Sequence, residues 1–346
     1  MRCFQGNRKM KHGKKCKIDK YTLILIVLLL LLTGLVIAWK LPQKEDRYIH
    51  VGIAVYDRSD TFMESYIREL EDKIGQMRIL GKKVSYEIYD AEGIGSRQEK
   101  QLQEMYAQDY DVMLVNLVEP ASAASVLTDA KDADIPVILF NREIDEKDLK
   151  ISKNVWYVGT DARAAGVMQG KLLKDLWKKQ SRILDWNGNG MLDYVLVEGE
   201  ESHFDAIRRT SGFLETGAEL PLNQKGNILA EWKRELAYEK FAALDDEAVQ
   251  NVEAVICNND DMALGVYDYY KEKNLKLPVI IGINNSEEMH QKIMSGEMYG
   301  TIDNKMEDQV MEICRLMQAI LKKDTGSYQK VWYSTPKAIV KAEGTE

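Results

Sequence analysis

The stretch YIHVGIAV, residues 48–55, begins a series of short apolar segments on which the fold depends. Segments of this kind are typical of strands that are buried on both faces of a parallel sheet. Amphipathic stretches with helical periodicity separate most of the segments, which favours βαβ units. We predict further strands at 83–90, 111–117, 135–140, 193–199, 227–232, 253–259 and 277–284.

The length of the chain predicts more than one folded unit. It has 346 residues, of which 45% are hydrophobic, and chains longer than about 250–300 residues tend to divide into domains. We therefore expect an α/β protein with two lobes and an anchor that precedes them.

The anchor is predicted at 21–39, YTLILIVLLLLLTGLVIAW, which holds no charged residue. A helix needs about 20 such residues to cross the hydrocarbon core. Residues 1–20 hold eight Lys or Arg and are predicted to stay in the cytoplasm as a basic tail. A short linker at 40–47 then leads to an extracytoplasmic body, at the cell surface or on the periplasmic side. A cleaved signal peptide is the alternative, but the run is longer than the usual ~7–15 residues and no A-x-A site follows it.

The body is acidic. The whole chain has a formal net charge of −8, and the first 20 residues contribute +7, so the remainder carries −15. An acidic surface of this kind argues against nucleic acid as the partner.

Polar and aromatic residues follow the predicted strands. In open parallel sheets ligands bind beyond the carboxyl ends of the strands. Asn, Asp and Arg can satisfy sugar hydroxyls, and aromatic rings can stack on the C–H faces of a pyranose. A monosaccharide site is therefore predicted, although Asn and Asp also cap helices and form turns, and the aromatic residues could belong to the core. The residues at these strand ends are Asp60, Phe62, Asn116, His203, Asp205, Arg209, Trp232, Asn258, Asn259, Asp260, Asn284, Asn285 and Asn304.

The segment DWNGNGMLD, residues 185–193, has the ligand spacing of a calcium-binding EF-hand loop. Leu196 stands where the loop would need its Glu, and a predicted strand follows, so a free-standing EF-hand is rejected. A polar Asn-Gly turn is the alternative. A real site would need a further carboxylate from elsewhere. The candidate oxygen ligands in the segment are Asp185, Asn187, Asn189, the backbone of Met191, and Asp193.

From residue 48 to about 340 the chain resembles the galactose/glucose-binding proteins of bacterial sugar uptake and chemotaxis, which have the type 1 periplasmic binding protein fold. The resemblance depends on several short motifs that recur in order. They are SDTFM (59–63), VNLVEPASAAS (115–125), GEESHFDAIRR (199–209), NNDDMALG (258–265) and GTIDN (300–304).

The resemblance implies roles for individual residues. Glu253, at the start of EAVICNND, would supply the missing calcium ligand. Asn284 stands in GINN where the family has an Asp, and this removes a carboxylate that would accept two sugar hydrogen bonds. The implied sugar contacts are Asp60, Phe62, Asn116, His203, Asp205, Arg209, Trp232, Asn259, Asn284 and Asn304.

The resemblance also implies a mechanism. Two Rossmann-like lobes would close on the sugar about a hinge, with Phe62 and Trp232 on either side of the ring and Asp205 paired with Arg209. The first lobe would comprise 48–141 with about 305–330, and the second about 142–304 with 331–346.

Three classes of function compete. A monomeric binding protein would deliver a hexose to an ABC importer, or a tethered sensor would signal to a histidine kinase or chemoreceptor. A hydrolase with Asp60 and Asp205 as paired carboxylates is disfavoured, since no nucleophile elbow, P-loop or Gly-rich dinucleotide motif occurs.

Overall fold

The computed structural model of the chain describes residues 20, 21, 29, 48–245 and 249–341. No helix within these residues is both long enough and apolar enough to cross a membrane. The predicted tail, anchor and linker, residues 1–47, lie outside the described residues except at Lys20, Tyr21 and Leu29. The anchor therefore stays a prediction.

The strands of the described residues form two sheets, and the first has seven strands in the order β12-β6-β5-β4-β1-β3-β2. All pair in parallel except β2, which is antiparallel to β3. The strands are β1 (Tyr48–Val55), β2 (Arg78–Ile79), β3 (Lys82–Asp90), β4 (Val112–Val115), β5 (Val137–Asn141), β6 (Val155–Thr160) and β12 (Val331–Ser334).

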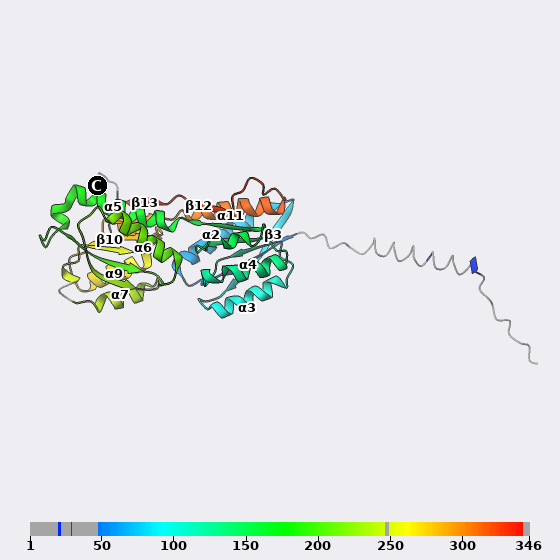
Figure 1. The fold of residues 1–346 in the computed structure, drawn as a ribbon, viewed down its shortest axis with the longest axis horizontal. Helices are drawn as coiled ribbons and strands as arrows, with labels where there is room; N and C mark the ends of the chain where they lie inside the picture. Colours follow the sequence, from blue (N-terminus) through cyan, green and yellow to red (C-terminus); the bar gives the residue numbers. More distant parts are fainter. Residues whose placement is uncertain (1–19, 22–28, 30–47, 246–248, 342–346) are drawn as a thin grey trace, which may run out of the picture. The chain divides into compact units, whose positions relative to one another are not determined.

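The helices of the first lobe are α2, α3, α4 and α11 within the described range, and Figure 1 shows them around this sheet. Two short 3₁₀ helices, η1 and η2, complete it. The bounds are α2 (Thr61–Gln76), α3 (Gly95–Tyr106), η1 (Pro120–Ser122), α4 (Ala123–Asp132), η2 (Asp148–Lys150) and α11 (Met306–Leu321).

The second sheet has six strands in the described residues, in the order β13-β11-β10-β9-β7-β8, and β13 is antiparallel to β11. Its strands are β7 (Leu192–Glu198), β8 (Leu222–Leu229), β9 (Ala254–Cys257), β10 (Val279–Ile283), β11 (Gly300–Asp303) and β13 (Lys337–Val340). The helices of this lobe include α5 (Ala162–Leu184), α6 (Phe204–Gly217), α7 (Arg234–Ala242), α9 (Asp260–Glu272) and α10 (Glu287–Ser295).

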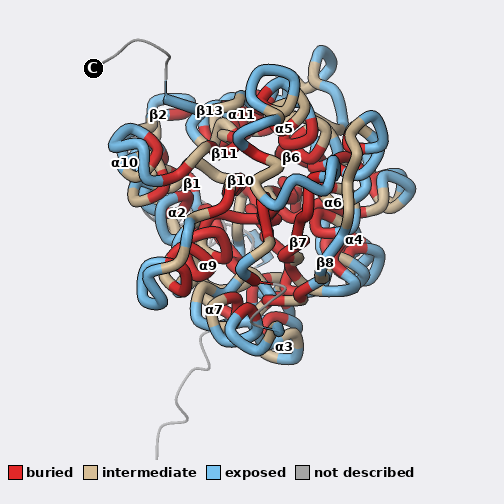
Figure 2. Tube along the Cα trace, turned by 90° about the vertical axis from the view of Figure 1, so that its left-hand side faces the viewer, coloured by how far each residue is buried: buried red, intermediate tan, exposed pale blue. Residues whose placement is uncertain are grey.

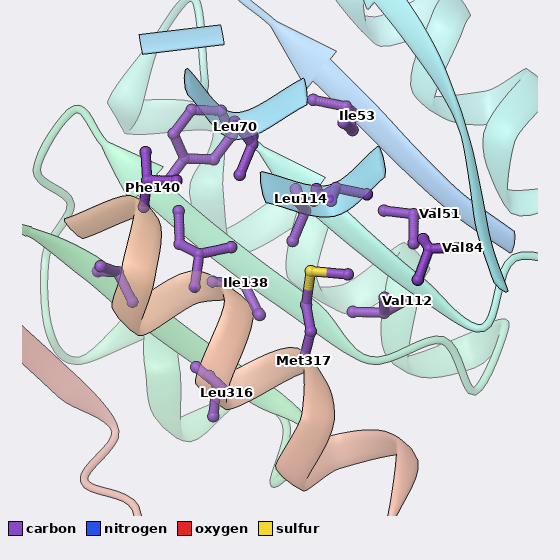
Figure 3. Packing of buried hydrophobic residues seen from close by; sticks show 14 of the residues in the cluster. Val51, Ile53, Leu70, Val84, Val112, Leu114, Ile138, Phe140, Leu316 and Met317 are labelled. Atoms are coloured by element: carbon purple, nitrogen blue, oxygen red, sulfur yellow. The ribbon is translucent and has the colours of Figure 1, made fainter. Parts of the chain in front are cut away.

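Side chains of the first sheet alternate between two apolar cores, because successive residues of a strand point to opposite faces. Val112 and Leu114 of β4 belong to the core under α2 and α11, whereas Met113 and Val115 belong to the core under α3 and α4. Figure 3 shows the first of these cores, in which Met317 of α11 lies against the strand residues. Burial of each large apolar side chain contributes about 1.5–3 kcal/mol.

The second lobe is built on the same plan. Val195 and Val197 of β7 face one core, and Tyr194 and Leu196 face the other. Figure 2 shows β7 and β10 as buried strands, with exposed turns at the periphery. The predicted α/β fold with parallel sheets is therefore confirmed for the body of the chain.

The division between the lobes differs from the predicted one. The prediction began the second lobe at residue 142 and assigned 331–346 to it. The structure pairs β6 with β5 and β12 with β6, so the first sheet runs to Thr160 and also includes Val331–Ser334. Only β13, from Lys337, joins the second sheet at the end of the chain. Which sheet a strand joins depends on its pairing partners, and the local sequence does not show these.

Three segments of the described chain cross between the lobes, after β6, after β11 and after β12. A cluster of buried polar side chains ties them together. The hydroxyl groups of Thr160 and Ser334 are 2.8 Å apart, and each donates to the carbonyl oxygen of Asn304, at 2.9 and 2.7 Å. Gln309 of α11 donates to the same carbonyl at 2.8 Å and to the Thr160 hydroxyl at 2.7 Å.

Helices α5 and α6 approach each other at glycines. A Cβ at Gly166 would lie far inside the van der Waals distance of the Arg209 carbonyl oxygen, and one at Gly212 would meet the carbonyl oxygen of Arg163. The absent side chains thus allow the two backbones to touch. This contact fixes the position of Arg209 on α6.

We expect Gly166→Ala to lower the free energy of unfolding by about 1–3 kcal/mol, because the added methyl group forces the two helices apart. Urea unfolding of the purified body would measure the change. Gly75→Ala in α2 is the matched control, since no atom lies within 4 Å of the added Cβ. It should be neutral or raise stability by about 0.5–1 kcal/mol. Equal effects of the two variants would contradict the close-packing argument.

Candidate functional site

A cavity lies between the two lobes at the carboxyl ends of their strands. The residues that line it come from both lobes and are Tyr56, Asp60, Phe62, Asn141, Arg142, His203, Asp205, Arg209, Trp232, Asn259 and Asn284. Eight of the ten predicted sugar contacts are among them. The other two, Asn116 and Asn304, lie behind this lining.

Three of the lining residues also cap helices. A side-chain oxygen of Asp60 accepts from the backbone N–H of Met63 at 2.8 Å, which begins α2. Asn259 accepts in the same way from Met262 at 2.9 Å and begins α9. The capping and ligand-binding interpretations of these residues are compatible, since capping occupies one polar atom and holds the side chain at the rim of the cavity.

His203 is the third cap, and its hydrogen bond determines its tautomer. Nδ1 accepts from the backbone N–H of Asp205 at 3.1 Å, so the proton of the neutral ring lies on Nε2. Nε2 is buried and has no partner. Burial, followed by the positive charges of Arg142 and Arg209, lowers the pKa of His203 to about 2. The ring is therefore neutral at physiological pH and offers one hydrogen-bond donor to a ligand.

Two arginines balance the buried carboxylate of Asp205. Burial raises the pKa of Asp205, while the charges of Arg209 and Arg142 oppose that rise. The predicted direct pair between Asp205 and Arg209 does not form. Arg209 donates instead to the carbonyl oxygen of Asn258 at 2.7 Å, and its Nε atom is buried without a partner. Arg209 thus keeps an unused hydrogen-bond donor in the cavity.

Trp232 has an unusual backbone conformation. Its φ angle is 67°, in the left-handed region that bulky residues seldom adopt. Strain of this kind persists where the surrounding structure enforces it, often at ligand sites. The indole lies edge-on to His203, with ring centroids 5.4 Å apart, and packs where a side chain at Gly199 would be. Its Nε1 atom is buried without a partner.

Asn116 and Asn304 support the lining from behind. Asn116 is fully buried and donates to the carbonyl oxygen of Phe140 at 3.0 Å, beneath Asn141. Asn304 donates to the side-chain oxygen of Asn284 at 2.9 Å. The structure thus places the two predicted contacts one step away from the cavity, behind residues that line it.

Sequence analysis missed Tyr56, Asn141 and Arg142, although two of them directly follow predicted strands. Asn141 ends β5 with a φ angle of 64° and brings Arg142 to the cavity. The Arg142 guanidinium lies 3.7 Å from the centroid of the Tyr56 ring and donates to Glu200 of the second lobe at 3.1 Å. The rule that ligands bind beyond the carboxyl ends of parallel strands, here called the strand-end rule, would have found Arg142 if it had been applied to 135–140 as it was to the other strands.

The cavity is narrow in this structure. Its volume is about 40 Å³, far below the range of about 300–1,000 Å³ that is usual for ligand sites. The lobes touch beside it, since Thr61 donates to Asp261 and Arg208 pairs with Glu143. A sugar can enter only if these contacts open and the lobes or side chains move apart.

The predicted calcium loop, residues 185–193, runs from the end of α5 into the start of β7 in the second lobe, and none of its residues lines the cavity. Glu253 does reach it, as the resemblance implied. Its carboxylate accepts from the backbone N–H groups of Trp186 at 2.8 Å and of Asp193 at 2.9 Å. Gly188 and Gly190 have φ angles of 70° and 79°, which suits glycine at these turns.

The donors of the loop are largely engaged with one another. Asn187 and Asn189 donate to Asp193, and Asp185 accepts from Gly190 at 3.0 Å. Among the described residues, no group of three or more His, Cys, Asp or Glu side chains is arranged to hold a metal ion. One observation does fit a cation, because an oxygen of Asp185 is buried without a hydrogen-bond partner.

We predict a pH dependence of stability from His203. The depressed pKa means that below pH 6.5 the unfolded chain binds a proton that the folded chain does not, so stability is lost on acidification. Between pH 7 and pH 5 the loss from this group is about 2 kcal/mol. In denaturant titrations the His203→Gln variant should lose correspondingly less than the parent. Parallel pH profiles would show that His203 is not buried in its neutral form.

Comparisons with known proteins agree with this architecture. A family model described as periplasmic binding protein domain matches residues 51–325. A D-galactose/methyl-galactoside binding periplasmic protein of Haemophilus influenzae is 29% identical over 293 residues, which cover 82% of this chain and 84% of the relative. A galactofuranose-binding protein of Escherichia coli is 27% identical over 248 residues, 69% of this chain and 74% of the relative.

Solved structures show the same fold. The myo-inositol binding protein of Caulobacter superimposes with a TM-score of 0.72 at 23% identity, covering 87% of this chain and 95% of that protein. At this identity the likeness concerns the fold alone. The family match spans most of the chain and includes the strands of both sheets except β12 and β13, with the first three residues of β1 also outside it. The chain therefore belongs to the periplasmic binding protein domain family.

Proposed function

We propose that this protein is an extracytoplasmic receptor for a sugar, most specifically a hexose of the galactose or glucose type, and that it delivers the sugar to an ABC importer. The observation that supports this most directly is the inter-lobe cavity with its unpaired buried donors. His203 Nε2, Arg209 Nε and Trp232 Nε1 are all buried without partners. Buried polar groups are normally paired, so three in one cavity indicate a polar ligand.

The chemistry of the lining fits a monosaccharide. Two aromatic rings, Phe62 from the first lobe and Trp232 from the second, offer apolar surface to the faces of a pyranose. The carboxylates of Asp60 and Asp205 would accept hydrogen bonds from sugar hydroxyl groups, and Arg209 would donate hydrogen bonds to sugar oxygens. The charges of these side chains strengthen such hydrogen bonds. The names of the relatives, which bind galactose, methyl-galactoside and galactofuranose, support the same class of ligand.

The proposed mechanism is closure of the two lobes on the sugar. The closed form is favoured because the ligand makes contacts with both lobes that neither lobe offers alone. A membrane permease would then recognise the closed form. The body would be monomeric and held at the membrane by residues 21–39, with the basic tail of residues 1–20 in the cytoplasm.

A tethered sensor that signals to a histidine kinase or chemoreceptor stays an alternative, since the ligand site would be the same. An enzymatic role has less support. Asp60 is engaged in capping α2, and the relatives are named as binding proteins.

The proposal includes a structural calcium ion at the loop of residues 185–193. The ligands would be Asp185, Asn187, Asn189, Met191 through its carbonyl, Asp193 and Glu253. The unpaired buried oxygen of Asp185 supports this assignment. The ion would supply charge neutralisation for three acidic side chains and no chemistry at the cavity.

Titration calorimetry of residues 47–346 against galactose, glucose, ribose and xylose would test the sugar site. We expect binding of a hexose in the micromolar range or tighter. Trp232→Ala should weaken that binding at least tenfold, because the stacking surface and a hydrogen-bond donor are both lost. Trp177→Ala, at a partly buried position of the second lobe outside the cavity, is the control and should leave affinity unchanged. No binding of any sugar would refute the proposed function.

Chelation would test the calcium proposal. Dialysis against EDTA should lower the melting temperature by several degrees, and added Ca²⁺ should restore it, because an ion that binds only the folded state stabilises it. Sugar affinity should change little. The Asp185→Asn variant should respond less to Ca²⁺ than the parent. A melting temperature that is the same with EDTA and with Ca²⁺ would contradict the assignment.

A further inference from the structure

A second cavity lies beside the first and is much larger. Its volume is about 660 Å³, within the range of about 300–1,000 Å³ that is usual for ligand sites. The two cavities share Phe62 and Asn284 in their linings. We call this second cavity the side chamber. The ring of Phe62 and the amide of Asn284 thus form a common wall between a narrow site and a wide one.

Both lobes contribute to the side chamber. The first turns of α2 and α11 provide Thr61, Ser65 and Met306 from the first lobe. The loop after β10 and the start of α10 provide Asn285 and His290 from the second. A group that occupies the side chamber would therefore contact both lobes, as the sugar in the narrow cavity does.

Most of the residues that line the side chamber are polar, and several of them hold one another in place. Asn285 has a φ angle of 60° and its side-chain oxygen lies 3.0 Å from Nδ1 of His290, so the two residues hold each other in place. Lys305 pairs with Asp303 at 3.1 Å. Hydroxyl, amide and imidazole groups of this kind bind a polar, hydroxylated group better than an alkyl chain.

Negative charge predominates in the side chamber. Glu287, Glu307 and Asp308 line it, and none of the ion pairs in the described residues neutralises them. The Lys305 charge is already matched by Asp303. An anionic group would meet like charge on both lobes, which disfavours it.

We propose that the physiological ligand is an extended sugar, either a disaccharide or a glycoside with an aglycone larger than methyl, with one ring in the narrow cavity and an uncharged or cationic second group in the side chamber. This inference rests on the proposed function and narrows its substrate class. Free space of 660 Å³ beside the proposed sugar site is what an extended ligand requires, and the acidic lining disfavours a carboxylated second group.

The test uses ligands that share one sugar ring. After the monosaccharide panel has identified the bound hexose, calorimetry compares that hexose with its methyl and 2-aminoethyl glycosides in both anomers, with disaccharides that carry the hexose, and with its carboxymethyl glycoside. We expect at least one disaccharide or aminoethyl glycoside to bind within tenfold of the hexose or tighter. The carboxymethyl glycoside should bind at least tenfold more weakly than the aminoethyl glycoside of the same anomer.

A variant that fills the side chamber separates its role from that of the narrow cavity. Ser65→Trp places a large ring in the side chamber from an exposed position of α2. It should weaken binding of the extended ligand at least tenfold and leave the hexose within threefold. Ser96→Trp, at the start of α3 and outside both cavities, is the matched control and should affect neither ligand.

The outcomes distinguish this inference from the proposed function. Absence of binding by every sugar would refute both. Binding of the free hexose, with all extended ligands weaker by more than tenfold, would refute the side chamber as a subsite and leave the sugar receptor intact. Equal weakening of hexose and extended ligand by Ser65→Trp would likewise refute it, because the substitution would then act on the narrow cavity.

Discussion

The two lobes depend on one buried cluster of hydrogen bonds where the chain crosses between them. Thr160, Ser334 and Gln309 all donate to the carbonyl oxygen of Asn304. Each of the three crossing segments contributes a residue to the cluster, so no segment can shift without disturbing the other two. A buried polar group without its partners costs about 1–3 kcal/mol. The cluster therefore fixes one end of the inter-lobe space and leaves the opposite side free to open.

The same crossing controls the cavity through one further hydrogen bond. The side chain of Asn304 donates to Asn284, which stands at a φ angle of 132° in the lining. Asn284 also forms part of the wall of the side chamber. A rotation at the crossing is therefore transmitted to the position where this chain has Asn and the galactose/glucose-binding proteins have Asp. An amide there can both donate and accept, whereas a carboxylate would only accept.

Much of the fold could be predicted from the sequence because the strands of buried parallel sheets are short apolar runs. The cavity lining followed from the strand-end rule at positions such as His203 and Asn259. The place where the lobes divide could not be predicted, since β6 and β12 belong to the first sheet through pairing with distant segments. Nor could the conformation of Trp232 be predicted. A positive φ angle is rare for tryptophan, and its local sequence would suggest the continuous strand that we predicted at 227–232.

Two of the contacts that join the lobes beside the cavity are ion pairs. Arg142 meets Glu200 and Arg208 meets Glu143, each pair joining one lobe to the other. The Debye length falls from about 10 Å at 0.1 M salt to about 3 Å at 1 M. Arg142 and Glu143 are only 5% and 2% exposed, so salt screens these pairs less than exposed pairs while the lobes touch, and it would act on them fully once the lobes separate.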